Sequence, residues 1–327
     1  MRNSISHRQS KLKWRSKWVL RRLRRLVCSK LYRDTNRDLQ KSILVAGAAR
    51  SGTTWLGDIL ASQLHGRILF EPFHSRKVKA FSDYHYFHYM RPHEKDEALI
   101  TLCQRVFSGD IRNKWIDNHV EVLWPQYRII KEIRANLMLK WIQNHFPQVP
   151  QLFIIRHPCA VVLSRLALKW DTDRDIEPLL AQPKLVEDFL REKMDVIREA
   201  VSPEEKHAII WCITNLIPLK QFQKDELNIF FYEHLCTQPH EEITRLFQSI
   251  QLDYGSALFN TLKTPSTTAR PTSAIVVGED NLSRWQNRLR SRQIDKILGV
   301  VEAFGLEHLY GDSLTPQMDR LLPTQYP

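Results

Sequence analysis

One stretch near the N-terminus, residues 43–56, constrains the fold more than any other part of the chain. It begins with an apolar run, Ile43–Ala46, which is typical of a strand buried in a parallel sheet. A turn containing Gly47 and Gly52 follows, and a helix-compatible segment starts at Trp55. Where a strand, a turn and a helix meet in this way, unpaired backbone N–H groups and the helix dipole converge and can bind an anion. We therefore predict an α/β fold with an anion-binding loop.

The spacing of the two glycines matches the P-loop pattern G-x-x-x-x-G-K-[ST], with Thr54 at the final hydroxyl position. The lysine that normally reaches the β/γ-phosphates of a nucleoside triphosphate is replaced by Thr53, and the nearby cation is Arg50. Such a loop suits a nucleotide with a short 5′ anionic group and no γ-phosphate. Two other interpretations stay open here, an ordinary glycine turn and a degenerate NTPase loop.

A second strand-to-helix junction is predicted within residues 151–166. The apolar segment ends at Arg156, Pro158 lies where helices favour proline, and Ser164 falls about two turns into the helix. Arginine offers a phosphate forked N–H donors, and a serine hydroxyl adds a neutral donor. Two anion sites at two such junctions are what a nucleotide with 3′ and 5′ phosphates requires.

The two motifs together resemble those of the sulfotransferase family, which uses 3′-phosphoadenosine-5′-phosphosulfate (PAPS) as donor. The family's 5′-phosphosulfate loop reads roughly [K/R]-[ST]-G-[ST]-[ST]-[WF]-L, and residues 50–56 read R-S-G-T-T-W-L. Its 3′-phosphate motif, R-x-P-x₅-S, matches residues 156–164. The resemblance covers roughly residues 42–305 and implies a P-loop-NTPase-like central parallel sheet flanked by helices. The donor-binding residues that it implies are Arg50, Ser51, Gly52, Thr53, Thr54, Trp55, Arg156 and Ser164.

The resemblance also implies a reaction, transfer of a sulfuryl group from PAPS to an acceptor hydroxyl or amine by in-line displacement. Glu71 follows a short predicted strand, and carbohydrate-type members of the family carry a Glu-Pro pair at this point. A carboxylate at that end of a strand is well placed to accept a proton. We predict Glu71 as the general base, with His74 as the competing candidate, and Arg50 as a second catalytic residue that stabilises charge on the bridging oxygen. A Glu71 that caps the next segment or pairs with an arginine is the structural alternative.

The Glu-Pro pair and the arginine loop favour a carbohydrate, a glycolipid or another small hydroxyl compound as acceptor. Lys131, Arg134 and Asn136 could contact it, although such residues are more often surface or capping residues. No metal site is predicted, because His85 and His88 lack an acidic or cysteine partner at a convincing spacing. The alternative functions are a P-loop NTPase or small-molecule kinase, and a non-catalytic nucleotide-binding protein.

The first 33 residues carry the chain's net positive charge. They contain 12 of the 48 lysines and arginines and no acidic residue, so the rest has 48 − 12 = 36 basic residues against 36 acidic ones. Apolar residues recur with helical spacing between Val19 and Val27, with arginines largely on the other face, and Trp14 and Trp18 precede them. A basic amphipathic helix of this kind can lie on an anionic membrane. A solvated arm or a partner-binding arm is the alternative, and no nucleic acid is expected as a partner.

We divide the chain into a basic amphipathic arm (1–40), a sulfotransferase-like domain (41–310) and a C-terminal tail (311–327). The five scattered cysteines include no C-x-x-C pair, which favours a reducing compartment. No apolar run approaches 18 residues, and arginines interrupt every apolar stretch near the N-terminus. We therefore expect a cytoplasmic protein without a signal peptide or a transmembrane helix, with peripheral membrane contact through residues 1–33. The polar segment 263–283 is predicted to be a mobile loop.

Overall fold

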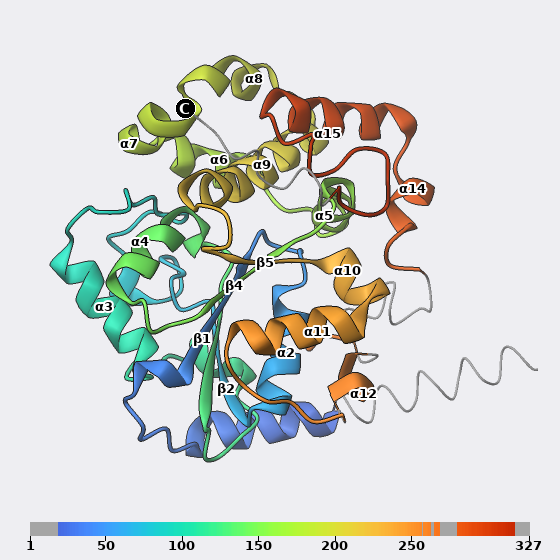
Figure 1. The fold of residues 1–327 in the computed structure, drawn as a ribbon. Helices are drawn as coiled ribbons and strands as arrows, with labels where there is room; N and C mark the ends of the chain where they lie inside the picture. The colour runs from blue at the N-terminus through green and yellow to red at the C-terminus, as the bar shows by residue number, and fades with distance from the viewer. Residues whose placement is uncertain (1–18, 257, 263–264, 269–279, 318–327) are drawn as a thin grey trace, which may run out of the picture.

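Five short apolar segments form the parallel sheet at the centre of the computed structural model (Figure 1). The strands are β1 (Ser42–Gly47), β2 (Gly66–Phe70), β3 (Tyr127–Lys131), β4 (Gln151–Ile155) and β5 (Asn228–Phe231). Their order across the sheet is β2-β3-β1-β4-β5, and every neighbouring pair is parallel. The structure describes residues 19–256, 258–262, 265–268 and 280–317, so most of the predicted loop 263–283 lies outside it. The predicted α/β fold with a central parallel sheet is confirmed.

Helices cover both faces of this sheet because successive strand residues point to opposite sides. Leu44 and Ala46 belong to the core that includes residues of α3, α4, α5, α9 and α15, whereas Ile43 and Val45 belong to the core that includes residues of α2, α10, α11 and α12. The helices are α2 (Thr53–Gln63), α3 (Glu97–Phe107), α4 (Leu139–His145), α5 (Pro158–Leu166), α6 (Asp173–Leu180), α7 (Pro183–Leu185), α8 (Met194–Glu199), α9 (Pro203–Gln221), α10 (Tyr232–Thr237), α11 (Pro239–Ser249), α12 (Leu258–Leu262), α14 (Arg284–Arg288) and α15 (Ser291–Ala303). No helix among the described residues combines the length and the apolar character needed to cross a membrane.

The middle of the sheet contains a switch in connectivity. The chain leaves β1 through α2 on one face, and it leaves the neighbouring strand β4 through α5 on the other face. Loops that diverge in this way open a crevice at the carboxyl ends of the two strands, which is where open α/β sheets bind ligands. The two motifs found in the sequence flank this crevice.

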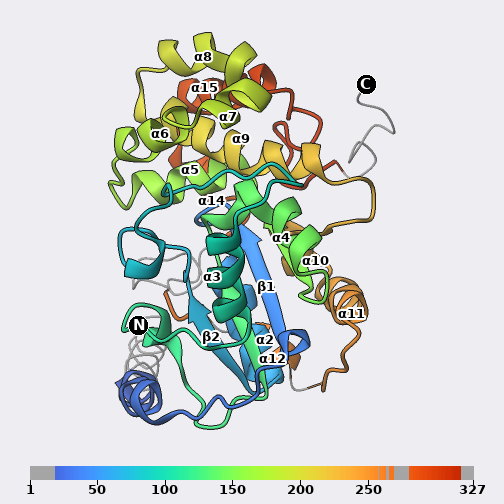
Figure 2. The ribbon, with the colours of Figure 1, turned by 90° about the vertical axis from the view of Figure 1, so that its left-hand side faces the viewer.

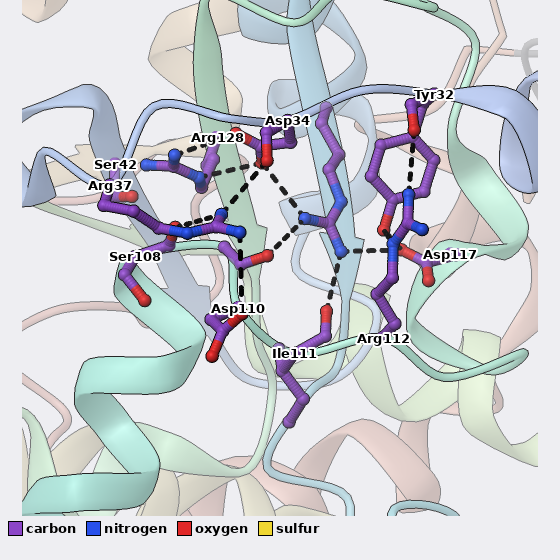
Figure 3. Close-up of polar contacts among 12 residues, drawn as sticks. Tyr32, Asp34, Arg37, Ser42, Ser108, Asp110, Ile111, Arg112, Asp117 and Arg128 are labelled. Atoms are coloured by element: carbon purple, nitrogen blue, oxygen red, sulfur yellow. Dashed lines mark hydrogen bonds and ion pairs between the residues drawn. The ribbon is translucent and has the colours of Figure 1, made fainter.

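A helix over residues 19–31 precedes the sheet and lies at the opposite end of the molecule from α8 (Figures 1 and 2). The chain that follows it is fixed to the sheet by Asp34, whose carboxylate pairs with Arg128 on β3 at 2.8 Å (Figure 3). The same carboxylate pairs at 3.0 Å with Arg67, the direct cross-strand neighbour of Arg128 on β2. Both guanidinium groups are buried, and Asp34 is the acidic side chain that they share, while Arg67 also pairs with Asp117 at 2.8 Å.

Replacing Asp34 with alanine is expected to destabilise the fold by about 3–5 kcal/mol, because two buried arginines lose their shared counter-charge. Denaturant unfolding of the variant measures this cost directly. Asp110→Ala is the matched control, since the Asp110–Arg37 pair is more than half exposed and 3.5 Å long, and it should change the unfolding free energy by less than about 0.5 kcal/mol. An equal loss of unfolding free energy in both variants would show that the buried ion pairs of Asp34 stabilise the fold no more than an exposed pair does.

Candidate functional site

The loop between β1 and α2 is built by close backbone packing at its two glycines. A Cβ atom at Gly47 would lie 2.3 Å from the carbonyl oxygen of Ile154, so no larger residue fits between β1 and β4. Gly52, the N-cap of α2, has φ 107°, and a Cβ there would lie 2.7 Å from the ring of Tyr232. This left-handed conformation turns the chain into α2 and favours glycine. The first backbone N–H groups of α2 therefore face the crevice.

The two predicted anion-binding motifs meet in the structure. Arg50, which has φ 79°, donates from Nε to the Oγ atom of Ser164 at 2.9 Å. Arg156 follows β4 and donates from Nη1 to the carbonyl oxygen of Arg50 at 3.4 Å. Arg50, Arg156 and Ser164 thus form one cluster at the crevice, although 106 and 114 residues separate Arg50 from the other two. All three residues are half-buried.

Two residues that the sequence did not assign to the site hold Arg156, and a third fixes the turn that follows it. Its Nη2 atom donates to the main-chain oxygen and to Oδ1 of Asn281 at 3.0 and 3.1 Å. Its guanidinium lies 4.2 Å from the centre of the Tyr232 ring, and Asn281 donates to the Tyr232 hydroxyl. Glu233 accepts a hydrogen bond from the main chain of His157 at 3.0 Å and so fixes the turn after Arg156. Tyr232 directly follows β5, and this position at the carboxyl end of a strand was the signal for a role at the crevice.

Several polar atoms of the loop are buried without a hydrogen-bond partner among the described residues. They include the Oγ atom of Ser51, the Nε1 atom of Trp55 and the Nε atom of Arg156. A buried donor without a partner is costly, and such groups in native proteins commonly await a ligand or water. Two of the three are N–H donors, and Ser51 is fully buried beside Gly52, so the cluster fits an anionic ligand. Thr53 is also buried, and Thr54 is half-buried at the same helix start.

Glu71 lies at the same edge of the sheet, two strands away from β1, with φ 48°. Its two carboxylate oxygens accept from Lys131 Nζ and Arg134 Nη1, each at 2.5 Å, and all three side chains are buried. Burial alone would raise the pKa of Glu71, but the two cations lower it to about 2. Glu71 is therefore ionised at neutral pH. Its pairing with an arginine was the structural alternative, and that contact is present, while a role as base stays a prediction.

The residues expected at the surface near Glu71 are buried instead. Lys131 and Arg134 hold Glu71, and Asn136 donates to the carbonyl oxygen of Thr214 at 3.1 Å. The surface interpretation of these three residues was wrong, because Lys131 and Arg134 are the counter-charge of a buried carboxylate and Asn136 bonds to a buried main-chain oxygen. Contact with an acceptor stays a prediction for each of them.

Two further titratable groups flank Glu71. His74 is buried, and burial together with the nearby Arg134 lowers its pKa to about 3, so its ring is neutral. Glu132 is fully buried and neither of its carboxylate oxygens has a hydrogen-bond partner among the described residues. Burial raises its pKa to about 8, and the charge of Glu71 adds to this rise. Two neighbouring carboxyl groups thus have opposite protonation states at neutral pH, Glu71 ionised and Glu132 neutral.

The aromatic and histidine-rich segment 81–93 is partly buried, with Phe81, Phe87, Tyr89 and Met90 in the core and His85 exposed. The rings of His85 and His88 stack 5.9 Å apart, and burial lowers the pKa of His88 to about 4. Tyr86 accepts from Arg134 at 2.5 Å and therefore belongs to the surroundings of Glu71. Among the residues that the structure describes, no group of three or more histidine, cysteine, aspartate or glutamate side chains is arranged to hold a metal ion. Absence of a metal stays a prediction.

Comparison with known proteins shows the family to which the chain belongs. Searching the curated proteins gives no match. Among solved structures, the sulfotransferase domain of the olefin synthase from Synechococcus PCC 7002 is 16% identical, with a TM-score of 0.42 and coverage of 84% of this chain and 98% of that domain. The sulfotransferase domain of the curacin biosynthetic pathway is 12% identical (TM-score 0.43, 81% and 97% covered), as is a mouse sulfotransferase solved with PAP (TM-score 0.41, 84% and 87% covered). The profile of the sulfotransferase family matches residues 42–256, more than half of the 327 residues, so this chain belongs to the sulfotransferase family.

Proposed function

We propose that this protein transfers a sulfuryl group from PAPS to a hydroxyl or amine group of a small acceptor. The observation that carries the proposal is the meeting of the two motifs, where Arg50 Nε lies 2.9 Å from Ser164 Oγ and Arg156 contacts the backbone of Arg50. A donor with phosphate groups at both ends of its ribose needs two anion sites that share one crevice. A single P-loop would bind a nucleotide, but it would not explain the second arginine and serine.

Different residues of the two loops would bind the 5′ and 3′ groups of such a donor. The backbone N–H groups at the start of α2, with the hydroxyl groups of residues 51–54, would bind the 5′ phosphosulfate. Arg156 and Ser164 would bind the 3′-phosphate, which is the group that distinguishes PAPS from ATP. Bound PAPS supplies an activated sulfuryl group with a phosphate as leaving group. Arg50, fixed by Ser164, would place a positive charge where negative charge develops on the leaving oxygen.

Glu71 is the proposed base for the acceptor hydroxyl. Lys131 and Arg134 hold its negative charge, so it is deprotonated across the neutral pH range, which is the form that a base requires. The neutral ring of His74, buried beside it, stays the competing candidate. Aromatic rings surround this position, since His74 contacts both Tyr86 and Trp115. Flat apolar rings beside a carboxylate suit a carbohydrate or glycolipid acceptor, and this acceptor class is part of the proposal.

Two rival functions predict different ligands. A P-loop NTPase or small-molecule kinase would bind Mg·ATP. The lysine that contacts the β/γ-phosphates in such proteins is replaced here by Thr53. A non-catalytic nucleotide-binding protein would bind PAP, the desulfated product, without turnover. A cytoplasmic location accompanies the proposal and also stays a prediction.

Calorimetry with PAP and with Mg·ATP is expected to show micromolar or tighter binding of PAP and at least about tenfold weaker binding of Mg·ATP. The reason is that Arg156 and Ser164 offer donors to a 3′-phosphate that ATP does not have. Transfer of labelled sulfate from PAPS, screened across sugar, lipid and phenol acceptors, then tests turnover and acceptor class. Tight ATP binding without PAP binding would overturn the proposal, and PAP binding without transfer to any acceptor would favour the non-catalytic rival.

A further inference from the structure

The helix over residues 19–31 turns its apolar side away from the protein. Its aliphatic side chains are 49–67% exposed, whereas most large apolar side chains of the described residues are buried. These exposed side chains are Val19, Leu20, Leu23, Leu26, Val27 and Leu31. They recur at helical spacing around Leu23, so they form one continuous stripe on the outer side of the helix. We use the name arm surface for this stripe together with the exposed basic residues of the same segment, Arg22, Arg24, Lys30 and Arg33.

The inner side of the helix is fixed by charge and by packing. Arg21 and Arg25 both pair with Glu121, at 2.5 and 2.7 Å. One to two turns further on, Cys28 and Tyr32 are buried against Val120. Rolling the helix to bury its leucines would break these ion pairs and expose this small core. The outward position of the stripe is therefore built into the structure.

The charges around the stripe indicate what it contacts. The exposed residues Arg22, Arg24, Lys30 and Arg33 belong to the same segment, which contains no acidic residue. The preceding 18 residues add six more basic residues and again no acid: Arg2, Arg8, Lys11, Lys13, Arg15 and Lys17. Beside the end of the helix, a recess of about 450 Å³ is lined by four arginines (Arg33, Arg37, Arg105 and Arg112) and two acidic residues (Asp34 and Asp110), so its lining is basic on balance. An apolar stripe bordered by basic residues is complementary to a partner that has an apolar layer beneath a negatively charged surface.

A tryptophan from another part of the chain lies at the same end. Arg33 donates from its main chain to the carbonyl oxygen of Leu123 at 2.7 Å, and the next residue, Trp124, is 72% exposed. Tryptophan is enriched at the interface between the headgroups and the acyl chains of a bilayer. Its exposure beside the helix adds an interfacial side chain to the arm surface.

We propose that the arm surface docks this protein on an anionic lipid bilayer, with the aliphatic stripe between the lipid headgroups and the arginines and lysines at the phosphates. A second copy of the chain is a poorer occupant. Two arm surfaces brought face to face would oppose basic residues to basic residues, with no acid in either segment to compensate. An acidic protein partner would match the charge, and the test below separates it from lipid.

Flotation of the full-length protein with vesicles tests the proposal. We expect binding to phosphatidylcholine vesicles that contain about 30% phosphatidylserine, weaker binding to phosphatidylcholine alone, and loss of binding as salt is raised. The double variant Leu23→Gln/Leu26→Gln should lower the partition coefficient for anionic vesicles by about tenfold or more, because it interrupts the centre of the stripe. Lys30→Gln/Arg33→Gln should lower it less and reduce its dependence on salt.

Val201→Gln is the matched control, because Val201 is 79% exposed and lies next to α8, at the opposite end of the molecule from the helix. It should bind vesicles like the wild type, and circular dichroism should show that every variant is folded. Wild-type protein that stays unbound with anionic vesicles overturns the proposal, as does a leucine double variant that binds undiminished. Sedimentation that shows a wild-type dimer and a monomeric leucine double variant would assign the stripe to a second copy and equally overturn it.

Discussion

The Arg156→Ala variant is expected to bind PAP roughly 100-fold more weakly than the wild type, a loss of about 3 kcal/mol. Charge-assisted hydrogen bonds to phosphate are among the strongest that a side chain makes, and the arginine fork makes two of them. In the structure Arg156 is oriented by Asn281 and by the ring of Tyr232, so its guanidinium loses little freedom on binding. Calorimetric titration with PAP measures the loss.

The comparison of PAP with AMP separates a contact to the 3′-phosphate from a general effect on the loop. AMP lacks the 3′-phosphate, so Arg156→Ala should change its affinity by less than about threefold. Ser164→Ala is expected to weaken PAP by about tenfold, because one neutral hydrogen bond is lost and the Nε atom of Arg50 loses its acceptor. Weakening of PAP and AMP by the same factor would instead mean that Arg156 supports the loop through the carbonyl oxygen of Arg50.

Arg245→Ala provides the matched control for this experiment. Its guanidinium also lies over an aromatic ring, 4.0 Å from the centre of Phe230, and it pairs with Glu242 on the same helix. Arg245 is 44% exposed and belongs to α11, away from the two loops. Its removal tests what the loss of any ring-stacked arginine does to PAP binding, and we expect no measurable change.

The sheet and both loops could be predicted from the sequence because they depend on local chemistry. Buried parallel strands appear as short apolar runs, and the turn that needs Gly52 at φ 107° leaves a glycine in the sequence. The pairing of Arg50 with Ser164 was not predictable from spacing alone. It depends on β1 and β4 being neighbours in the sheet, which no local pattern specifies.

The surroundings of Glu71 and the orientation of the arm show what local patterns miss. Lys131 and Arg134 resemble ordinary surface residues in sequence, and they become a buried counter-charge only once β2 and β3 lie side by side. The helical spacing between Val19 and Val27 predicted an amphipathic helix that could lie on a membrane, but it did not show what holds the apolar side outward. Glu121, a residue that no motif singled out, does so by pairing with Arg21 and Arg25.

The second large effect is expected at Glu71. In Glu71→Gln, kcat for sulfate transfer should fall by about 10²–10⁴-fold, the usual contribution of a general base, while PAP affinity stays within about threefold. The variant is expected to remain folded although Lys131 and Arg134 lose their partner. The charge of Glu71 raises the pKa of the adjacent Glu132, so its removal lets Glu132 ionise and compensate the two cations.

The pH dependence follows from the two pKa shifts. The pKa of Glu71 is lowered to about 2, so its protonation should cause no fall in kcat between pH 5 and 8. The stability that its ion pairs contribute is present above the ordinary pKa of 4.5 and is lost only as the pH falls toward 2. Glu132 has the opposite sign, because its raised pKa favours the folded state below pH 4.5 and this contribution is lost as the pH rises through about 8. Unfolding measured from pH 4 to 9 should therefore show stability that declines between about pH 4.5 and 8, where Glu132 is ionised in the unfolded chain but neutral in the folded one, and that levels off above pH 8.

Glu132→Gln is the matched control for Glu71→Gln, because it places the same amide at a neighbouring buried carboxyl. Glu132 is already neutral at pH 7, so its replacement should leave kcat within about threefold and abolish the loss of stability between about pH 4.5 and 8. Glu71 is ionised, so the same chemical change removes a charge there and should lower kcat by the factor of about 10²–10⁴ given above. Equal activity of the two variants would show that the negative charge of Glu71 is not needed for the reaction. A Glu71→Gln variant that loses PAP binding along with activity would make Glu71 a support for Lys131 and Arg134, and His74 would then be the base to test.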